Sequence, residues 1–439
     1  MARRGPIHVI GAGLAGSQAA LTIARLGGRV VLHEMRPVKQ TAAHRTAMAA
    51  ELVCSNSLRS DQAHSTPWLL KQELRMLDSE VLQIATETAI PGGSSLTVDR
   101  DVFSRRVTEA LATSPSIQIC LEEVTAIPDD GVCVIATGPL TGDALARSIQ
   151  GLTGEDNLSF FDALNPILEG DSINEARTFA AARHTPGADD FLNCPLTRDE
   201  YLRFHAELVA AESHTSHDFE TGRFLGCPPL EKLARSGVDT LRYGPMRPVG
   251  LPDPATGQVP YAVVQLRREN LRSDSFNMVG FQNQLKWSEQ KRVFRMLPGL
   301  EAVEFVRFGQ MHQNTYLRAP RLLTPALNLR TRPDVFVAGQ LCGVEGYVES
   351  IATGLVAGLN AWRRSMDLPV RVLPRPSGLG SICHYLAHAD ADDFAPVRLT
   401  FDLLPPVDER QRQARRERQC LRALDALAAQ VATLRSDAA

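Results

Sequence analysis

The chain has 439 residues, 44% of them hydrophobic, so it can bury a substantial core and fold as two or more domains. Its formal net charge of −3 excludes a molecule whose overall field attracts nucleic acid, while a local basic patch stays open. No run of about 18 apolar residues predicts a membrane span. The eight cysteines include no C-x-x-C pair, which disfavours zinc or another metal and predicts reduced thiols in a cytoplasmic protein.

The first predicted element is an apolar strand that runs into a glycine-rich turn and a helix, residues 17–26. Gly11, Gly13 and Gly16 have the spacing of a dinucleotide-binding fingerprint. Gly11 makes the tight turn, Gly13 lets backbone amides approach the pyrophosphate, and Gly16 lets the helix pack against the strand. The start of the helix then directs its unpaired N–H groups at the phosphates.

A second strand, residues 29–32, leads to Glu34. This carboxylate lies at about the 20-residue distance at which an acid accepts hydrogen bonds from the adenosine ribose hydroxyls. It also disfavours a cofactor with a 2′-phosphate. The order of strand, glycines, helix, strand and acid predicts a dinucleotide site; the alternative is that the glycines only form turns.

Farther along, we expect one helix over Trp68–Glu87 and a buried strand from Val132 that ends at Gly138. Near the C-terminus, residues 334–354 read as a strand, a glycine turn and a new helix. A late strand and helix that return to the first domain can address the flavin end of FAD, and a simple NAD dehydrogenase does not need them. FAD is therefore favoured over NAD. The residues expected to bind it are Gly11, Gly13, Leu14, Ala15, Gly16, Glu34, Arg36, Gly138, Gly339, Gly346 and Glu349.

These elements predict an α/β fold in which a Rossmann-like FAD-binding domain carries an inserted mixed α/β substrate domain. We place the first part of the FAD domain at 1–150, the inserted substrate or RNA domain at 151–312, the closing part at 313–374 and a helical tail at 375–439. The inserted domain includes expected strands at 262–267 and 277–280. In the tail, 409–434 has apolar residues at helical spacing and six arginines between 410 and 422. A solvated, partly packed helix is the favoured interpretation, with a contact to RNA phosphates as the alternative.

Two cysteines differ from the rest in their surroundings. Cys54 lies in the polar string V-C-S-N-S-L-R, whose donors can stabilise a thiolate. Cys227 precedes two prolines and an expected helix, so a rigid turn can present its sulfur near a helix N-terminus. Cys120, Cys133 and Cys342 occur in or beside apolar runs, where a cysteine is usually a small buried hydrophobe.

Several strings resemble one family closely and in order along nearly the whole chain. They include V-I-G-A-G-L-A-G-S, E-M-R-P, A-E-L-V-C-S-N-S-L, F-L-N-C-P-L-T, G-P-M-R-P-V-G-L, Q-L-K-W and G-V-E-G-Y-V-E-S. The sequence thereby resembles the TrmFO family of folate- and FAD-dependent tRNA uracil-5-methyltransferases. The flavin domain is also similar to that of MnmG, a tRNA-modifying flavoprotein that is longer and has an additional C-terminal helical domain.

The resemblance implies methylation at C5 of the T-loop uridine of tRNA, with methylenetetrahydrofolate as carbon donor and NAD(P)H-reduced FAD as reductant. It implies that Cys227 attacks C6 of the uracil and that Cys54 lies near the flavin and assists, for example in removing the C5 proton. By the same resemblance, His312 binds folate, with its ring facing the pterin over the flavin. The uridine would have to leave its stacked loop to react.

Three other functions fit the same sequence less well. The same chemistry could act on ribosomal RNA, which only the choice of RNA substrate distinguishes. An MnmG-like modification of the wobble uridine is disfavoured by the length of the chain. A flavin-bearing RNA-binding protein would bind FAD and tRNA and give no folate-dependent product.

Overall fold

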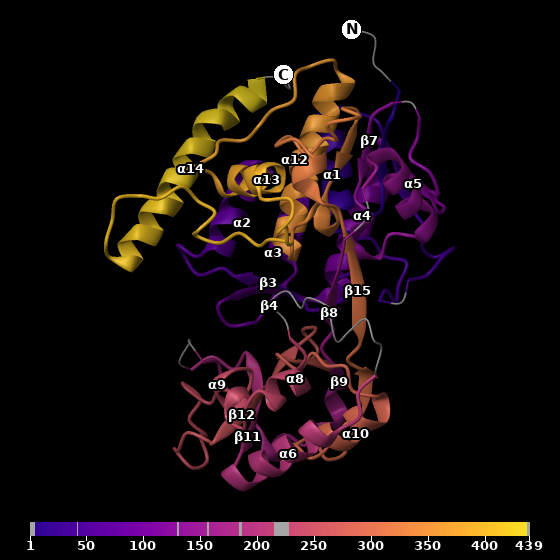
Figure 1. Cartoon of the computed structure of the whole chain (residues 1–439). Helices are drawn as coiled ribbons and strands as arrows, with labels where there is room; N and C mark the ends of the chain where they lie inside the picture. Colours follow the sequence, from indigo (N-terminus) through magenta and orange to yellow (C-terminus); the bar gives the residue numbers. More distant parts are fainter. Residues whose placement is uncertain are drawn as a thin grey trace.

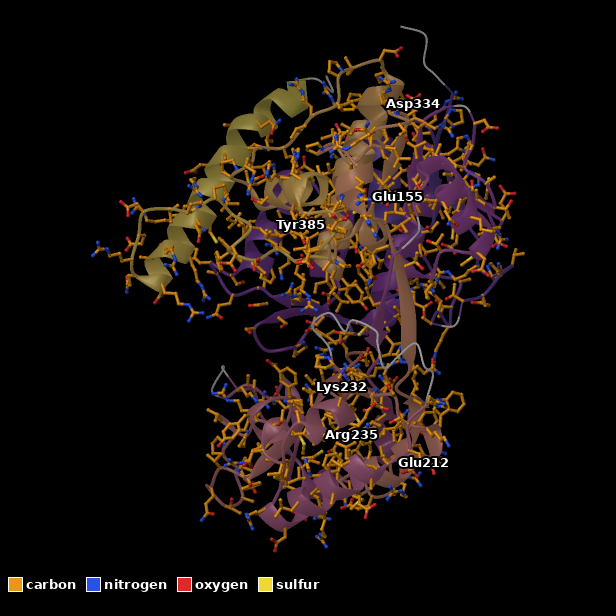
Figure 2. All side chains as sticks on the ribbon, viewed as in Figure 1. Glu155, Glu212, Lys232, Arg235, Asp334 and Tyr385 are labelled. Atoms are coloured by element: carbon orange, nitrogen blue, oxygen red, sulfur yellow. The ribbon has the colours of Figure 1, made fainter. Side chains whose placement is uncertain are left out.

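The computed structural model describes residues 5–41, 43–129, 131–155, 158–183, 187–214 and 228–436, and describes the backbone alone at 158–163, 311–314 and 432–436. These residues form an upper and a lower half in Figure 1. In Figure 2, Glu155, Asp334 and Tyr385 lie in the upper half, whereas Glu212, Lys232 and Arg235 lie in the lower half.

The upper half is built on a five-stranded parallel sheet in the order β16-β7-β1-β2-β6. The strands are β1 (Ile7–Ile10), β2 (Val30–Glu34), β6 (Ile117–Leu121), β7 (Cys133–Ile135) and β16 (Val335–Val337). Every residue of β7 and β16 is buried, as expected for a parallel sheet that helices cover on both faces. The Rossmann-like α/β fold predicted from the sequence is confirmed.

The closing segment returns to the first helix of the chain. Helix α12 (Tyr347–Ser365) packs on α1 (Leu14–Arg25) through two glycines. A Cβ atom at Gly354 would lie 2.2 Å from the carbonyl oxygen of Ala15, and one at Gly358 would lie 2.7 Å from that of Ala19. Only glycine permits this close crossing, which brings the start of α12 to the glycine-rich turn.

The single helix expected over Trp68–Glu87 is wrong, because two helices occupy this region, α2 (Thr66–Met76) and α3 (Glu80–Glu87). Between them Asp78 adopts a left-handed backbone with φ of +55°. The Ser79 hydroxyl accepts a hydrogen bond from the Leu82 N–H and caps α3. The left-handed Asp78 and the Ser79 cap therefore end one helix and begin the next, although the apolar pattern is continuous.

The rest of the upper half surrounds this core. A small sheet contains β3 (Ser57–Ser60), β5 (Ser95–Val98) and β4 (Ala89–Ile90), and the further helices are α4 (Arg100–Thr113), α5 (Asp143–Thr153), α11 (Ala319–Leu322), α13 (Gly378–His388) and α14 (Arg412–Ser436). Helix α14 lies along the outside of α2 and α13 (Figure 1). It buries Cys420, Ala423 and Leu427 and exposes Arg412, Arg415 and Arg418, so the expected partly packed helix is confirmed.

The lower half contains a six-stranded antiparallel sheet in the order β10-β11-β12-β13-β9-β14. Its strands are β9 (Ile167–Glu169), β10 (Phe179–Ala180), β11 (Phe191–Leu196), β12 (Ala262–Arg268), β13 (Ser275–Met278) and β14 (Phe305–Arg307). The helices are α6 (Arg198–Ala210), α8 (Leu230–Arg235), α9 (Thr240–Tyr243) and α10 (Trp287–Phe294). The strand expected at 277–280 instead ends at Met278, because Gly280 turns the chain with φ of +78°.

Two paired antiparallel strands, β8 (Leu158–Ala163) and β15 (Met311–Tyr316), join the two halves. The domain boundary proposed at 312/313 falls within β15, and that at 150/151 falls within α5. Across the described ranges, no helix has the length and apolar content that crossing a bilayer requires.

Candidate functional site

A cleft opens at the carboxyl ends of the parallel strands, where ligands of such sheets usually bind. The space within the cleft and its open mouth amounts to about 1090 Å³. Of the eleven residues expected to bind FAD, eight line this cleft: Gly11, Gly13, Leu14, Ala15, Glu34, Arg36, Gly138 and Gly339. The structure therefore brings most of the expected cofactor residues together.

The three glycines of the fingerprint meet different steric demands. Gly11 has φ of +97°, and a Cβ atom there would lie 2.7 Å from the Ala136 carbonyl oxygen. A Cβ atom at Gly16 would lie 1.7 Å from the Gly11 carbonyl oxygen, so Gly16 serves packing and does not line the cleft. Gly13 has open space where its Cβ would be, and it precedes α1, whose first turn has no side-chain cap. Uncapped N–H groups at the cleft can bind an anion.

Glu34 is held by hydrogen bonds at the end of β2. Its Oε2 accepts from the Ala12 N–H at 2.8 Å, and its Oε1 accepts from Arg36 Nε at 2.9 Å and from the Arg36 N–H at 3.0 Å. Burial alone would raise the pKa of Glu34, but the Arg36 and Ala12 bonds outweigh it and lower this pKa. An ionised carboxylate retains lone pairs, so Glu34 can accept further hydrogen bonds from a ligand.

Arg36 is 2% exposed and lies between two carboxylates. Besides Glu34, it contacts Glu51 Oε2 at 3.4 Å, and Glu51 also accepts from the Thr46 hydroxyl at 2.7 Å. Arg36 lines the cleft, but its Nε and Nη1 donate to Glu34, to Glu51 and to the Thr46 carbonyl oxygen. It therefore positions Glu34, and its expected direct contact with a cofactor stays a prediction.

Gly346 and Glu349 hold the start of α12 and do not line the cleft. Gly346 precedes the helix with φ of +117°. Glu349 is 1% exposed, pairs with Arg59 at 3.2 Å and accepts a hydrogen bond from the Leu399 N–H. Their neighbours Tyr347 and Ser350 do line the cleft, so the start of α12 forms part of its wall.

Cys54 is half-buried and lies beside this wall. The Tyr347 hydroxyl accepts hydrogen bonds from the Cys54 N–H at 2.8 Å and from the Ser55 N–H at 3.2 Å. Val53, the preceding residue, lines the cleft together with Tyr347. One tyrosine thus connects the expected reactive cysteine to the cofactor cleft.

Other described cysteines have surroundings that suppress thiolate formation. Burial raises the pKa of Cys133, Cys342 and Cys420 to about 12. It also raises the pKa of Cys194 and Cys383. Cys133 and Cys342 are buried as expected, whereas Cys120 is only half-buried at the edge of the sheet.

Two expected site residues lie wholly or partly outside the described part of the chain. Cys227 lies outside the described residues. His312 lies on β15, where its backbone pairs with Asp162 of β8, and its side chain is outside the described part. Helix α8, expected after the prolines that follow Cys227, begins at Leu230 and exposes Lys232 and Arg235, both labelled in Figure 2.

Sequence reasoning missed part of the cleft wall. Tyr347 lies within a string that carried the family resemblance, but nothing local indicated that its hydroxyl faces Cys54. Other lining residues come from the segments after β2 and β6 and from the turn after β7: Thr41, His44, Glu51, Glu122, Glu123 and Thr137. His33, Cys120 and Glu122 also lie within 4.8 Å of one another, and His33 Nδ1 contacts Glu122 Oε1 at 3.1 Å.

Comparisons with known proteins agree with this geometry. The family model described as "Glucose inhibited division protein A" matches residues 6–369. A protein of Solibacter usitatus named methylenetetrahydrofolate--tRNA-(uracil-5-)-methyltransferase TrmFO is 52% identical over 434 residues, covering 96% of this chain and 98% of its own. A protein of the same name from Symbiobacterium thermophilum is 52% identical over 430 residues, covering 96% of each chain. Among solved structures, GidA of Aquifex aeolicus matches with a TM-score of 0.68 at 17% identity, over 98% of this chain and 75% of that one, which shows the fold.

Proposed function

Because the chain belongs to the TrmFO family of tRNA (uracil-5-)-methyltransferases, we propose that it methylates C5 of the T-loop uridine of tRNA, with methylenetetrahydrofolate as carbon donor, FAD as hydride carrier and NAD(P)H as reductant. The observation that carries this proposal is the identity of 52% to enzymes of that name over nearly the full length of both chains. The chain is accordingly an enzyme.

The residues of the cleft fit FAD. Gly13 leaves open space next to the uncapped start of α1, which suits a pyrophosphate. Glu34 is ionised and suits the ribose hydroxyls. Gly138 and Gly339, with φ of +67° and +72°, also line the cleft. When bound there, reduced FAD supplies the hydride that converts a methylene carbon into a methyl group.

The cysteines supply nucleophilic and proton-transfer chemistry. C5 of uracil is a poor nucleophile until a thiolate adds to C6 and converts the ring into an enolate. By family resemblance, we assign this attack to the Cys227 thiolate, which leaves again when the C5–C6 double bond re-forms. Cys54 beside Tyr347 is assigned the removal of the C5 proton, because it adjoins the cleft and lies in a polar segment.

His312 is assigned to the pterin of the folate, again by resemblance. Its strand β15 connects the two halves, so a folate at this strand would lie between the cofactor cleft and the inserted domain. The uridine has to leave its stacked loop to enter such a site.

The experiment that tests this function is nucleoside mass spectrometry on unmodified tRNA and ribosomal RNA transcripts incubated with the protein, FAD, NADPH and methylenetetrahydrofolate. We expect 5-methyluridine in the tRNA T-loop and none when folate is omitted. Cys227→Ser should abolish the product while the flavin absorbance is retained, and Cys420→Ser, which alters a buried cysteine of α14, is the matched control. Full activity of Cys227→Ser would remove Cys227 from the mechanism.

The same assay separates the other candidate functions. Product in ribosomal RNA alone would keep the chemistry and change the substrate. A modified wobble uridine would indicate MnmG-like activity. Binding of tRNA and FAD with no folate-dependent product would indicate an RNA-binding flavoprotein and contradict the proposal.

A further inference from the structure

Three arginines from both halves of the molecule hold the segment from Leu52 to Ser55. Arg100, at the start of α4, donates to the Leu52 carbonyl oxygen. Arg307 of β14 donates to the carbonyl oxygens of Val53 at 2.5 Å and Cys54 at 3.2 Å. Arg267 of β12 donates to the Ser55 hydroxyl at 2.8 Å. We call Arg100, Arg267 and Arg307 the arginine cluster.

The positive charge of the arginine cluster is not balanced by its ion pairs. Arg267 and Arg307 are 8% and 6% exposed. Within the described residues, Glu269 is the one carboxylate that forms an ion pair with the cluster, through Arg100 Nε at 2.6 Å. The two buried guanidinium groups and the half-buried one of Arg100 thus share one carboxylate, and a buried charge is costly unless an opposite charge compensates it.

The donors of the cluster are also incompletely used. Among the described residues, Arg267 Nε, Arg307 Nε and Arg100 Nη2 are buried and meet no hydrogen-bond acceptor. A second anion at this place would improve both the charge balance and the hydrogen bonding. Cys54 is the ionisable group in the segment that the cluster encloses.

The other charged and titratable groups around Cys54 do not offer that anion. Tyr347 of α12 faces the Cys54 N–H, and burial raises its pKa, so its hydroxyl stays neutral. Arg45, in the segment after β2, adds a further positive charge close to Arg307. Farther along α12, Glu349 is paired with Arg59.

The coupling between the cluster and the thiol is reciprocal. Burial lowers the pKa of Arg307 to about 10, and a negative charge on Cys54 opposes that shift. The same charge opposes the lowering of the Arg267 pKa by burial. A thiolate that stabilises two guanidinium groups is stabilised by them to the same extent.

From the contacts and the charge imbalance we propose that the arginine cluster holds Cys54 as a thiolate at neutral pH. The Cys54 Sγ–H bond breaks, its proton passes to solvent, and the electron pair stays on sulfur. In the reaction proposed above, this thiolate then takes the C5 proton of the uracil: an S–H bond forms, and the C5–H electron pair stays on the ring. The last step rests on the proposed function, whereas the ionisation itself does not.

Two of the three arginines belong to the inserted half, so the state of Cys54 depends on how that half packs on the flavin half. Arg267 and Arg307 are positioning residues in this account, since they act through Cys54 and not on the substrate. In addition to their hydrogen bonds to the Leu52–Ser55 segment, the positive charge of their side chains stabilises the Cys54 thiolate.

The test is the pH dependence of Cys54 alkylation by iodoacetamide in the FAD-bound protein, followed by mass spectrometry of the Cys54 peptide. We expect half-maximal reactivity well below the value of about 8.5 of an unperturbed cysteine. Arg267→Gln and Arg307→Gln should each raise the midpoint by about one pH unit, so that alkylation on the acidic side slows about tenfold. Arg267→Lys and Arg307→Lys, which keep the charge, should restore most of the rate.

Arg295→Gln is the matched control, because Arg295 lies in the same half and also donates to a main-chain carbonyl, that of Val303. It should leave the midpoint unchanged. A wild-type midpoint at or above about pH 8.5 would overturn the proposal, even if every variant failed to fold. Glutamine variants that retain flavin and show the wild-type midpoint would also overturn it. The alkylation assay contains no RNA or folate, so it is independent of methyl transfer. A low midpoint in a protein that shows no methyltransferase activity in the separate RNA assay would contradict the proposed function and leave the ionisation of Cys54 intact.

Discussion

Two regions of this enzyme bury arginine in opposite ways. Beside the cofactor cleft, one guanidinium, Arg36, lies between the two carboxylates Glu34 and Glu51. Around Cys54, three guanidinium groups share Glu269, the one carboxylate that forms an ion pair with them among the described residues. Among these side chains, the first region has two carboxylates for one guanidinium group, and the second has three guanidinium groups for one carboxylate.

The difference shows how buried charge can serve different roles. The guanidinium group of Arg36 and the Ala12 N–H keep Glu34 ionised and fixed as an acceptor for a neutral ligand group such as a ribose hydroxyl. Cations gathered around a thiol leave a place for an anion, which favours a reactive thiolate. Substitutions in these two regions test whether the difference in charge accounts for the two roles.

Replacing the thiol removes the anion from the positive region. We expect Cys54→Ser to lower the rate of methyl transfer by about 10²–10⁴-fold, the usual contribution of a group that transfers a proton in the transition state. Flavin content should not change, because the cleft residues are intact. Single-turnover formation of 5-methyluridine measures this, with Cys120→Ser as control, and a wild-type rate for Cys54→Ser would exclude Cys54 from proton transfer.

Removing the cation from the negative region should destabilise the fold. Arg36→Met leaves Glu34 and Glu51 without their buried partner, and breaking such a pair costs about 3–5 kcal/mol. Lys39→Met breaks the exposed Lys39–Glu123 pair and should cost less than about 1 kcal/mol. Denaturant unfolding of the flavin-free protein gives both values, and similar losses for the two variants would contradict the role assigned to Arg36.

Glu73 offers a third arrangement, a buried carboxyl that forms no ion pair within the described residues. It accepts hydrogen bonds from the N–H groups of Gly378 and Leu379 at the start of α13, and burial raises its pKa to about 8. Between about pH 4.5 and 8 the folded state thus holds a proton that the unfolded state has lost. The free energy of unfolding should therefore fall across this window as pH rises, by on the order of a few kcal/mol.

Glu73→Gln should remove that slope, because glutamine does not titrate. Unfolding curves from pH 5 to pH 8 compare the two proteins. Parallel slopes would show that Glu73 titrates alike in the folded and unfolded states.

The smallest effect concerns the exposed arginines of α14. If this helix contacts tRNA phosphates, Arg412→Gln and Arg415→Gln should each reduce the salt dependence of tRNA binding, by about one unit of the logarithmic slope. Arg147→Gln on α5 is the matched control, since α5 lies on the opposite side of the upper half (Figure 1). Unchanged slopes in all three variants would leave α14 as a solvated, partly packed helix.

The sequence allowed the flavin-type fold to be predicted because its signals are local. The fingerprint glycines, the acid at Glu34 and the strand and helix around Gly339 each act over a few residues. The break between α2 and α3 was missed because one left-handed residue, Asp78, interrupts a continuous apolar pattern. Local propensity did not indicate that interruption.

The surroundings of Cys54 could not be predicted in the same way. Its polar neighbours indicated a stabilised thiolate, but the groups that contact its segment are Arg100, Arg267, Arg307 and Tyr347. These residues lie on four elements far apart in the sequence, and tertiary folding alone brings them together. None has a spacing relative to Cys54 that a pattern could reveal.

Folate- and flavin-dependent methylation can be measured in a single turnover without NAD(P)H. The reaction contains the FAD-bound protein, reduced beforehand, unmodified tRNA transcript, and methylenetetrahydrofolate labelled with ¹³C at its methylene carbon. Mass spectrometry of the T-loop fragment then reports the origin of the methyl carbon and the need for reduced flavin. We predict ¹³C-labelled 5-methyluridine with the reduced protein and none with the oxidised protein. An unlabelled methyl group, or equal product from the oxidised protein, would contradict folate- and flavin-dependent methylation.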